Sequence, residues 1–381
     1  YILYSVSPDS GKVQWQHGIL DGTWIDGRFY ASSWIVGFMG SPTIVEGVMY
    51  INGPDGFVNA VNADTGAEIW RTEIGNELCA TPVVAEGKVF IGQTYGDEGL
   101  FYALDQATGD PIWSTDAYGN MWVSPVYNDG KLFIGGTSGM MYGVNVTNGS
   151  VLWSYDANFD TDGGITEKTE FGFYSVPCMD STNVYIGSWS GYYYSFRQSD
   201  GHLNWKTLTK ATNSVGGLPD SAALMINQGY VYVQKRGARI AELDVVTGAI
   251  QSEWTAPADY LQNGTVAASG DRIFGSVVQG VVKLPHNATI VAFDDVQNSG
   301  LNDREPTWTY VGGGGLTAPV TTSDKIIFGS SADMFVTCLD PIDGSVKWRT
   351  YTGGEMLENV PAIYGDKVFL QTKNGWVFAI E

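Results

Sequence analysis

The sequence predicts an all-β protein, a single eight-bladed β-propeller of four-stranded antiparallel blades that spans residues 1–381. Three observations predict it: a pattern of four strands recurs along the chain, a tryptophan recurs once per pattern, and the two chain ends supply complementary parts of one blade. The composition agrees, because 49 glycines, 21 tyrosines and only 16% charged residues suit short strands joined by tight turns. Hydrophobic residues make up 44% of the chain, which is enough to form a large core.

The repeat is clearest over residues 81–113. Residues 81–92 begin with Thr-Pro and continue with alternating apolar positions around a Glu-Gly pair, which predicts an inner strand A, a turn and a strand B. Residues 100–105 predict strand C. The segment Asp105-x-x-Thr108-Gly109 predicts a tight turn, in which Gly supplies a positive φ and Asp caps backbone N–H groups. Strand D then carries Trp113.

The tryptophan of strand D recurs at intervals of roughly 40 to 55 residues, at Trp15, Trp70, Trp113, Trp153, Trp205, Trp254, Trp308 and Trp348. A four-stranded unit cannot bury both of its faces alone, so eight units arranged around an axis bury them against one another. The run Asp-x-x-Thr-Gly-x-x-x-Trp resembles the tryptophan-docking repeat of the propellers similar to those that bind pyrroloquinoline quinone (PQQ-like propellers), over nearly the whole chain. In that family the indole packs between blades on a peptide of the next repeat. The resemblance therefore implies that these eight tryptophans are structural docking residues.

The two ends of the chain predict that the ring is closed by an N-terminal strand. Residues 359–381 supply strands A, B and C without a D strand, and residues 11–15 supply a D strand without its A and B strands. Joining them into the last blade hides edges that an open array would expose. Residues 1–6 also have the pattern of a C strand, and the sequence assigns no place to this surplus strand.

The direction of the strands separates two faces of the disk. Connections D–A and B–C share one face, which we call the loop face, and connections A–B and C–D share the other, the turn face. The long insertions fall in D–A connections, at residues 16–38, 154–172, 206–220 and 255–262, and in the B–C connection at 276–288. Elaborated loops on a rigid scaffold usually carry the binding residues, so the loop face is the candidate functional surface.

The first insertion is aromatic, with Trp24, Phe29, Tyr30, Trp34 and Phe38. Such a loop is either a lid packed over the mouth of the channel or an exposed anchor for a partner. Residues just before each strand A, Trp122 among them, are expected to ring the channel entrance as a mostly apolar funnel, with packing as their default role.

The second insertion carries oxygen ligands at alternate positions, followed by a Gly and an Ile, which resembles a calcium loop of the EF-hand type. The register is imperfect, because Thr169 stands where the last acid is expected. The candidate ligands are Asn158, Asp160, Asp162 and Glu170, and the alternative is a solvated turn.

A basic cluster in a B–C turn stands out in an acidic chain and consists of Lys235, Arg236 and Arg239. It can hold an anionic ligand or the carboxylates of a partner. The alternatives are a solvated turn and pairing with acids of the same chain.

Charge and motif content exclude several classes of function. A net charge of −21 repels phosphate backbones and anionic lipid, so nucleic-acid and membrane-surface binding are not expected. Three scattered cysteines give neither a disulfide framework nor a zinc motif, and three isolated histidines offer no catalytic set. No apolar run is long enough to span a membrane, and a chain that starts at Tyr1 is expected to be a processed or trimmed piece.

The resemblance implies two alternative functions. Quinoprotein dehydrogenases of the family bind PQQ and Ca²⁺ on the loop face, but they are longer, and many carry an adjacent cysteine pair that this chain lacks. Non-enzymatic relatives keep the repeat and bind proteins; they include the propeller lipoprotein of the bacterial outer-membrane assembly complex and archaeal surface proteins. We expect the second function: a non-catalytic scaffold outside the cytoplasm, in the periplasm or at the cell surface, with protein partners. Neither PQQ nor another cofactor is expected, and Ca²⁺ remains an open alternative.

Overall fold

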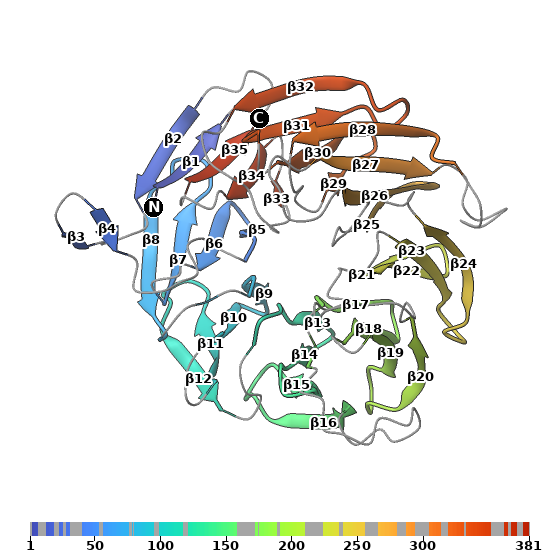
Figure 1. The fold of residues 1–381 in the computed structure, drawn as a ribbon. Coiled ribbons are helices and arrows are strands. Elements are labelled where there is room, and N and C mark those ends of the chain that lie inside the picture. Colours follow the sequence, from blue (N-terminus) through green and yellow to red (C-terminus); the bar gives the residue numbers. More distant parts are fainter. Residues whose placement is uncertain are drawn as a thin grey trace.

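The computed structural model describes residues 2–6, 13–18, 23–25, 28–30, 40–52, 56–75, 78, 80–94, 99–116, 121–157, 172–173, 175–188, 191–209, 224–235, 239–255, 266–279, 287–293, 305–313, 319–330, 333–351, 362–364, 367–371 and 376–380. Within these residues the regular structure is all β-strand, in seven sheets of four strands, one of five and one of two. The larger sheets stand around a central axis, each with its first strand innermost (Figure 1). The predicted propeller is confirmed.

The seven four-stranded blades are purely antiparallel and follow one another in chain order. The first four comprise, from strand A to strand D, β5 (Thr43–Val45), β6 (Val48–Asn52), β7 (Phe57–Asn62), β8 (Glu68–Glu73); β9 (Val83–Ala85), β10 (Lys88–Gly92), β11 (Phe101–Asp105), β12 (Pro111–Thr115); β13 (Val126–Asn128), β14 (Lys131–Gly135), β15 (Met140–Asn145), β16 (Val151–Asp156); β17 (Cys178–Met179), β18 (Asn183–Gly187), β19 (Tyr192–Arg197) and β20 (Leu203–Leu208). The next three comprise β21 (Leu224–Asn227), β22 (Tyr230–Lys235), β23 (Arg239–Asp244), β24 (Ile250–Thr255); β25 (Val266–Ser269), β26 (Arg272–Gln279), β27 (Asn287–Phe293), β28 (Trp308–Gly313); β29 (Val320–Thr321), β30 (Ile326–Gly329), β31 (Phe335–Leu339) and β32 (Val346–Tyr351).

The closing blade contains both chain ends. Strands β33 (Ala362–Tyr364), β34 (Lys367–Gln371) and β35 (Trp376–Ile380) are continued by β1 (Ile2–Val6) and β2 (Val13–Gly18), and β33 contacts β5 of the first blade. Closure by an N-terminal strand is thus confirmed, but the assignment of strands differs from the prediction. The surplus strand β1 takes the fourth place, parallel to β35, and β2 with Trp15 becomes a fifth strand. The physical reason is that β1 and β2 pair antiparallel along their length, so they join the sheet as a hairpin.

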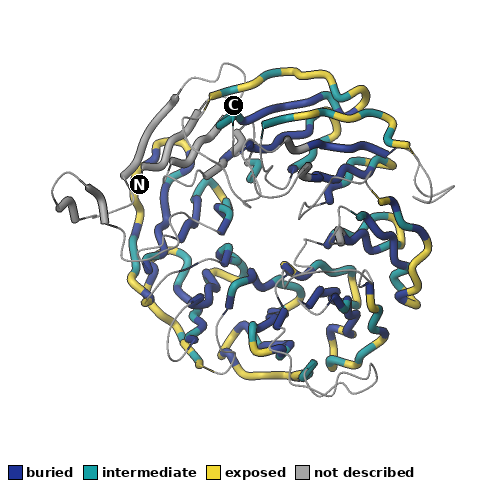
Figure 2. The backbone as a smooth tube through the Cα atoms, in the orientation of Figure 1, coloured by how far each residue is buried: buried dark blue, intermediate teal, exposed yellow. Residues whose placement is uncertain are grey.

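The core lies between the blades. Buried residues follow the inner strands of each blade, and the outermost strands carry most of the exposed ones (Figure 2). Each apolar cluster joins one face of a blade to the facing side of the next; Tyr50, Trp70, Val89 and Leu104, for example, belong to a cluster shared by the first two blades. At the inner end, side-chain bonds connect neighbouring A strands. The Thr43 hydroxyl donates to Pro82 O at 2.6 Å, and the Thr321 hydroxyl donates to Ala268 O at 2.6 Å. Each blade is therefore stabilised mainly by its neighbours.

The docking tryptophans share one register. In the first blade, Tyr50 of strand B, Ala60 of strand C and Trp70 of strand D lie side by side, with Tyr50 and Trp70 ring centroids 5.9 Å apart. The strand C residue in this register is small in every described four-stranded blade but one, because the indole lies across it. The other sets are Phe90–Ala103–Trp113, Phe133–Gly143–Trp153, Tyr185–Ser195–Trp205, Phe274–Ala292–Trp308 and Ile327–Cys338–Trp348.

Each docked indole is held by the C–D turn of the next blade. Trp70 Nε1 donates to Gln106 O at 3.0 Å, and the glycine of the same turn, Gly109, lies under the ring. A Cβ built on Gly109 would lie 2.6 Å from Trp70 Cε3, so only glycine allows this approach. The same pair of contacts recurs at four more seams, where Trp113, Trp153, Trp205 and Trp308 donate to Val146 O, Gln198 O, Val245 O and Pro341 O over Gly149, Gly201, Gly248 and Gly344.

Of the three other predicted docking tryptophans, Trp254 departs from the expected register. It follows the turn glycine Gly248 by six positions instead of four, so Ser252 occupies the docking position and pairs in register with Glu242. Trp254 is nevertheless buried in the cluster between this blade and the next, where its ring packs on Phe293 at 5.1 Å, edge to face. The turn that would receive its indole lies outside the described residues, so its docking stays a prediction. Trp348 stands in the docking register and is half-buried. The indole of Trp15 is outside the described residues.

We expect Gly109→Ala to destabilise the protein more than Gly87→Ala. Both residues have positive φ, +78° and +69°, so either substitution costs about 1–2 kcal/mol for the left-handed backbone. Gly87 has no heavy atom within 4 Å of a built Cβ, whereas Gly109 faces the Trp70 ring, which adds about 1–3 kcal/mol of overpacking. Urea unfolding measures the difference. Equal losses for the two variants would contradict the docking role of Gly109.

Candidate functional site

The turn face is regular, in agreement with the predicted division of faces. Four of its described A–B connections are two-residue turns in which both residues have positive φ: Glu46-Gly47, Glu86-Gly87, Asp129-Gly130 and Gln228-Gly229. In its C–D turns the Asp105 carboxylate accepts the backbone N–H groups of Ala107 and Thr108 at 2.9 Å each. The Thr108 N–H, with the Ala107 N–H second, holds the pKa of Asp105 below its ordinary value. This face is thus built chiefly from turns that serve the seams.

Buried polar side chains at the ends of the B strands bond the backbone of the connections on the loop face. Gln93 donates from Nε2 to Ile74 O at 2.6 Å and accepts from Leu100 N at 3.1 Å. Asn52 Nδ2 donates to Leu78 O, and the Thr94 hydroxyl donates to Met121 O at 3.1 Å. These bonds fix the roots of the D–A connections, so the loops rise from a rigid base.

The aromatic insertion contains a hairpin of its own. Strands β3 (Thr23–Ile25) and β4 (Arg28–Tyr30) pair with each other alone, with Trp24 opposite Phe29 and Thr23 opposite Tyr30. The hairpin stands outside the ring of blades, beyond β8, and not over the centre (Figure 1). Trp34 and Phe38 lie outside the described residues.

Of the predicted basic cluster, the structure describes the side chain of one member. Arg239 begins β23 and its Nη1 lies 3.2 Å from Glu253 Oε1, with side chains 34% and 25% exposed. Such a half-exposed pair contributes little to stability, but it shows that Arg239 bonds within its own blade. Lys235 ends β22 opposite Arg239, and Arg236 is outside the described residues. Trp122 precedes β13 between the buried Met121 and Val123 and is itself half-buried, and its place at the channel entrance stays a prediction.

The predicted calcium ligands Asn158, Asp160, Asp162 and Glu170 all lie outside the described residues, so the calcium loop stays a prediction. Among the residues that the structure does describe, no three His, Cys, Asp or Glu side chains gather as a metal site. In the same part of the chain, no helix has the length and the apolar character needed to cross a membrane.

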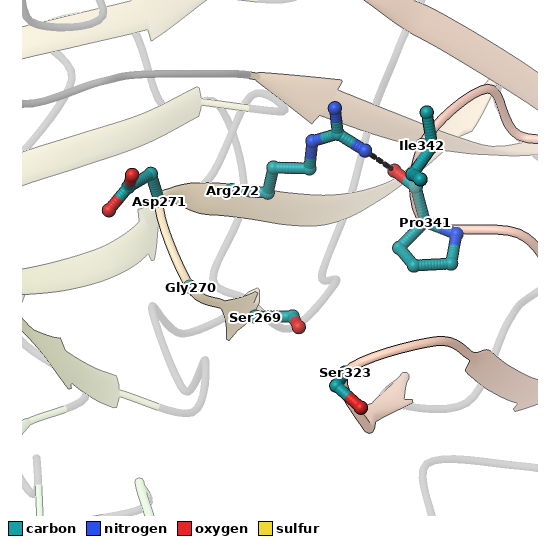
Figure 3. A pocket seen from close by; sticks show the side chains of 7 residues that line it. All are labelled: Ser269, Gly270, Asp271, Arg272, Ser323, Pro341 and Ile342. Carbon is teal, nitrogen blue, oxygen red and sulfur yellow. Dashed lines mark hydrogen bonds between the residues drawn. The ribbon is translucent and has the colours of Figure 1, made fainter.

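Two features were not found from the sequence. The first is a hollow of about 500 Å³ on the turn face, between the sixth and seventh four-stranded blades, lined by Ser269, Gly270, Asp271, Arg272, Ser323, Pro341 and Ile342 (Figure 3). Its polar groups serve the blade seams: Arg272 Nη1 donates to Pro341 O at 2.6 Å, and the Ser269 hydroxyl donates to Thr322 O at 2.9 Å. No single-sequence signal marks it, because its walls come from separate repeats. The second is the buried Glu242, whose signal is a carboxylate at a position that is small in the other blades.

The comparisons with known proteins agree with this architecture. A family described as outer membrane protein assembly factor BamB matches residues 1–164, 54–297, 166–350 and 286–381. A relative from Acidithiobacillus ferrooxidans, named tetrathionate hydrolase, is 25% identical and covers 89% of this chain and 72% of its own length. Outer membrane protein assembly factor BamB of Yersinia pestis is 24% identical and covers 99% of this chain and 79% of its own length.

Among solved structures, quinohemoprotein alcohol dehydrogenase from Comamonas testosteroni superposes with a TM-score of 0.66 at 13% identity, covering 88% of this chain and 70% of that chain. At this identity the likeness shows the fold alone. Proteins named as enzymes and proteins named as assembly factors are thus both similar to this chain.

We expect Gln93→Leu to lower the free energy of unfolding by about 2 kcal/mol or more, since it leaves Ile74 O and Leu100 N–H buried without a partner. Gln251→Leu is the matched control, because Gln251 is exposed on the outer strand β24 and its loss is expected to stay within about 0.5 kcal/mol. Urea unfolding compares the two variants. A Gln93→Leu variant as stable as the control would show that the loop roots do not depend on Gln93.

Proposed function

The chain belongs to the PQQ-like repeat family described as outer membrane protein assembly factor BamB, and we propose that it is a non-catalytic, protein-binding scaffold outside the cytoplasm. The match of the family model along the whole chain is the observation that carries the proposal. A relative that bears the same name aligns with nearly all of this chain, at 24% identity. Protein partners therefore follow from the family more directly than a substrate does.

The geometry supports a scaffold because its rigid and variable parts are separate. The seams are fixed by indole docking, and the D–A connections rise from roots that buried polar side chains hold. Binding residues on such loops can differ without loss of the ring. The β3–β4 hairpin, which stands outside the ring and carries Trp24 and Tyr30, is the first candidate contact with a partner. Trp34 and Phe38 belong to the same D–A connection, and Trp122 belongs to the connection between β12 and β13.

The setting and the metal are parts of the same proposal. A surface with 41 acidic and 20 basic residues suits a soluble domain in the periplasm or at the cell surface. Calcium at Asn158, Asp160, Asp162 and Glu170 would stiffen one D–A connection of the loop face. The scaffold proposal requires no other cofactor.

The hairpin provides the test of the partner surface. Replacing residues 22–31 with a short Gly-Ser linker removes β3 and β4 and leaves β2 and β5 in place. We expect this variant to keep its melting temperature within a few degrees, because the hairpin pairs with no blade, and to lose its partner after cross-linking in its own cells and purification. Arg197→Ala on the turn face is the control and should retain the partner. Equal recovery by both variants would remove the hairpin from the interface.

The enzymatic alternative rests on one specific observation, the relative named tetrathionate hydrolase, and on the fold shared with a quinohemoprotein dehydrogenase. We expect the purified chain, incubated with PQQ and Ca²⁺ and desalted, to retain no quinone absorbance and to reduce no dye with an alcohol or a sugar. We also expect the concentration of added tetrathionate to stay constant. Alcohol-dependent dye reduction would establish a dehydrogenase instead, and loss of tetrathionate would establish a hydrolase.

A further inference from the structure

At one seam among the described residues, the position of the docking tryptophan is occupied by another residue. In the blade formed by β21–β24, Glu242 takes the place of the small residue of strand C and Ser252 takes the place of the indole. Glu242 is 2% exposed and Ser252 is 3% exposed, so a carboxyl group lies inside a seam that is otherwise apolar. A buried carboxyl without a cationic partner is costly when it is ionised.

The acceptor side of the same seam is altered too. In the first two blades the tryptophan follows the first residue of the C–D turn by eight positions, from Asn62 to Trp70 and from Asp105 to Trp113. In the blade that faces Ser252 the same interval runs from Asp294 to Trp308, which is 14 positions. The indole and the short turn that receives it are thus lost together, as expected if each has a role only with the other.

Two hydroxyl groups of the same blade bond the Glu242 carboxyl. The Ser252 hydroxyl donates to Oε2, and the Tyr232 hydroxyl donates to Oε1 at 3.5 Å. In the first blade the equivalent hydroxyl, that of Tyr50, instead reaches across the seam to Gln106 O at 3.4 Å. At this seam, therefore, both described bonds to the carboxyl come from its own blade.

The described groups around Glu242 include no charge that would compensate it. From the facing blade the seam receives Val266 of β25, Ile273 and Val277 of β26, and Val291 and Phe293 of β27, all apolar. From its own blade, β22 brings the titratable Tyr232, with Tyr230 two residues away, and β24 brings Ser252 and Trp254. The charged neighbours face elsewhere: Arg239 and Glu253 pair on the opposite side of the sheet, and Arg272 of β26 donates to Pro341 at the following seam.

We propose that the seam between the blades β21–β24 and β25–β28 is a proton-operated joint, closed while Glu242 is neutral and loosened when Glu242 ionises. Five other seams are fastened by a contact that does not titrate between pH 4 and pH 8, an indole N–H donated to a backbone carbonyl. A rise in pH therefore loosens the Glu242 seam and leaves the docking bonds of those five seams unchanged. This inference is independent of the scaffold proposal, since it concerns the ring itself.

The direction of the effect follows from burial. Desolvation, opposed by the hydrogen bonds of Ser252 and Tyr232, raises the pKa of Glu242 above its ordinary value. A raised pKa means that the folded state binds the proton more tightly than the unfolded state. The protein then loses stability as the pH rises from about 4.3, the pKa of an unperturbed Glu, through the folded pKa. The turn carboxylates, such as Asp105 with its lowered pKa, have the opposite dependence, with stability lost on acidification.

Glu242→Gln isolates this contribution, because it keeps the size of the side chain and removes the titration. We expect the ratio of the unfolding constants of wild type and variant to be constant below pH 4 and to rise roughly tenfold for each unit by which the pKa of Glu242 exceeds about 4.3. Urea unfolding from pH 4 to pH 8 measures it. Glu253→Gln is the matched control on the opposite face of β24, and its ratio should not rise with pH in this way.

Hydrogen exchange in the wild-type protein tests the joint without any variant. After correction for the intrinsic exchange rate, amides of β24 and β26 should open more often at pH 8 than at pH 5, while amides of β8 and β10 at a docked seam should not. The change should be absent in Glu242→Gln. Opening that changes equally at both seams, or unfolding profiles of wild type and Glu242→Gln that run parallel across the pH range, would overturn the proposal.

Discussion

The fold depends on the contact between an indole and the backbone of the next blade. A single blade has four or five short strands and two apolar faces, so its stability comes from the seams. Each docked seam combines a buried ring, a hydrogen bond such as that from Trp70 Nε1 to Gln106 O, and a glycine beneath the ring. The contact ties three positions together: the indole, the small residue under it in strand C, and the turn glycine of the following repeat. A substitution at any of the three positions affects the same seam.

The docking contact constrains strands C and D and the turn face. The residues and lengths of the loop-face connections are therefore free to differ. The turns on one side must keep their length and their positive φ to receive the indole, as at Gly109 and Gly248. The D–A connections on the other side have no such task beyond a fixed root, which Gln93 and Asn52 provide for the connection from β8 to β9. This separation explains how similar chains can have different functions: the relatives and structural neighbours are named assembly factor, hydrolase and dehydrogenase. Function in this chain is therefore to be sought where the repeat is interrupted.

The sequence predicts most of the ring because the docking contact has a local signature. Asp-x-x-Thr-Gly-x-x-x-Trp is contained in a single turn and strand, so the spacing alone finds seams such as those of Trp70 and Trp113. It does not find the order of strands in the closing blade, since the pairing of β1 with β35 joins residues at opposite ends of the chain. Recurrence alone does not give the register of Trp254, because register depends on the distance from Gly248, which is six positions rather than four. The hollow beside Arg272 has no signature, because three turns from two blades form it.

The seam at Glu242 shows what an exception in a repeat means physically. If docking were lost by neutral drift, an apolar side chain would be the simplest replacement, because the cavity left by an indole is apolar and a hydrophobic group fills it at little cost. Instead the seam holds a carboxyl bonded by two hydroxyl groups of its own blade, while Trp254 has moved two positions along the strand to pack on Phe293. The apolar packing across the seam is thus retained around the carboxyl. A ring with one seam of this kind remains closed through its clusters, yet has one place where ionisation of a single group, rather than global unfolding, sets how firmly two blades hold together.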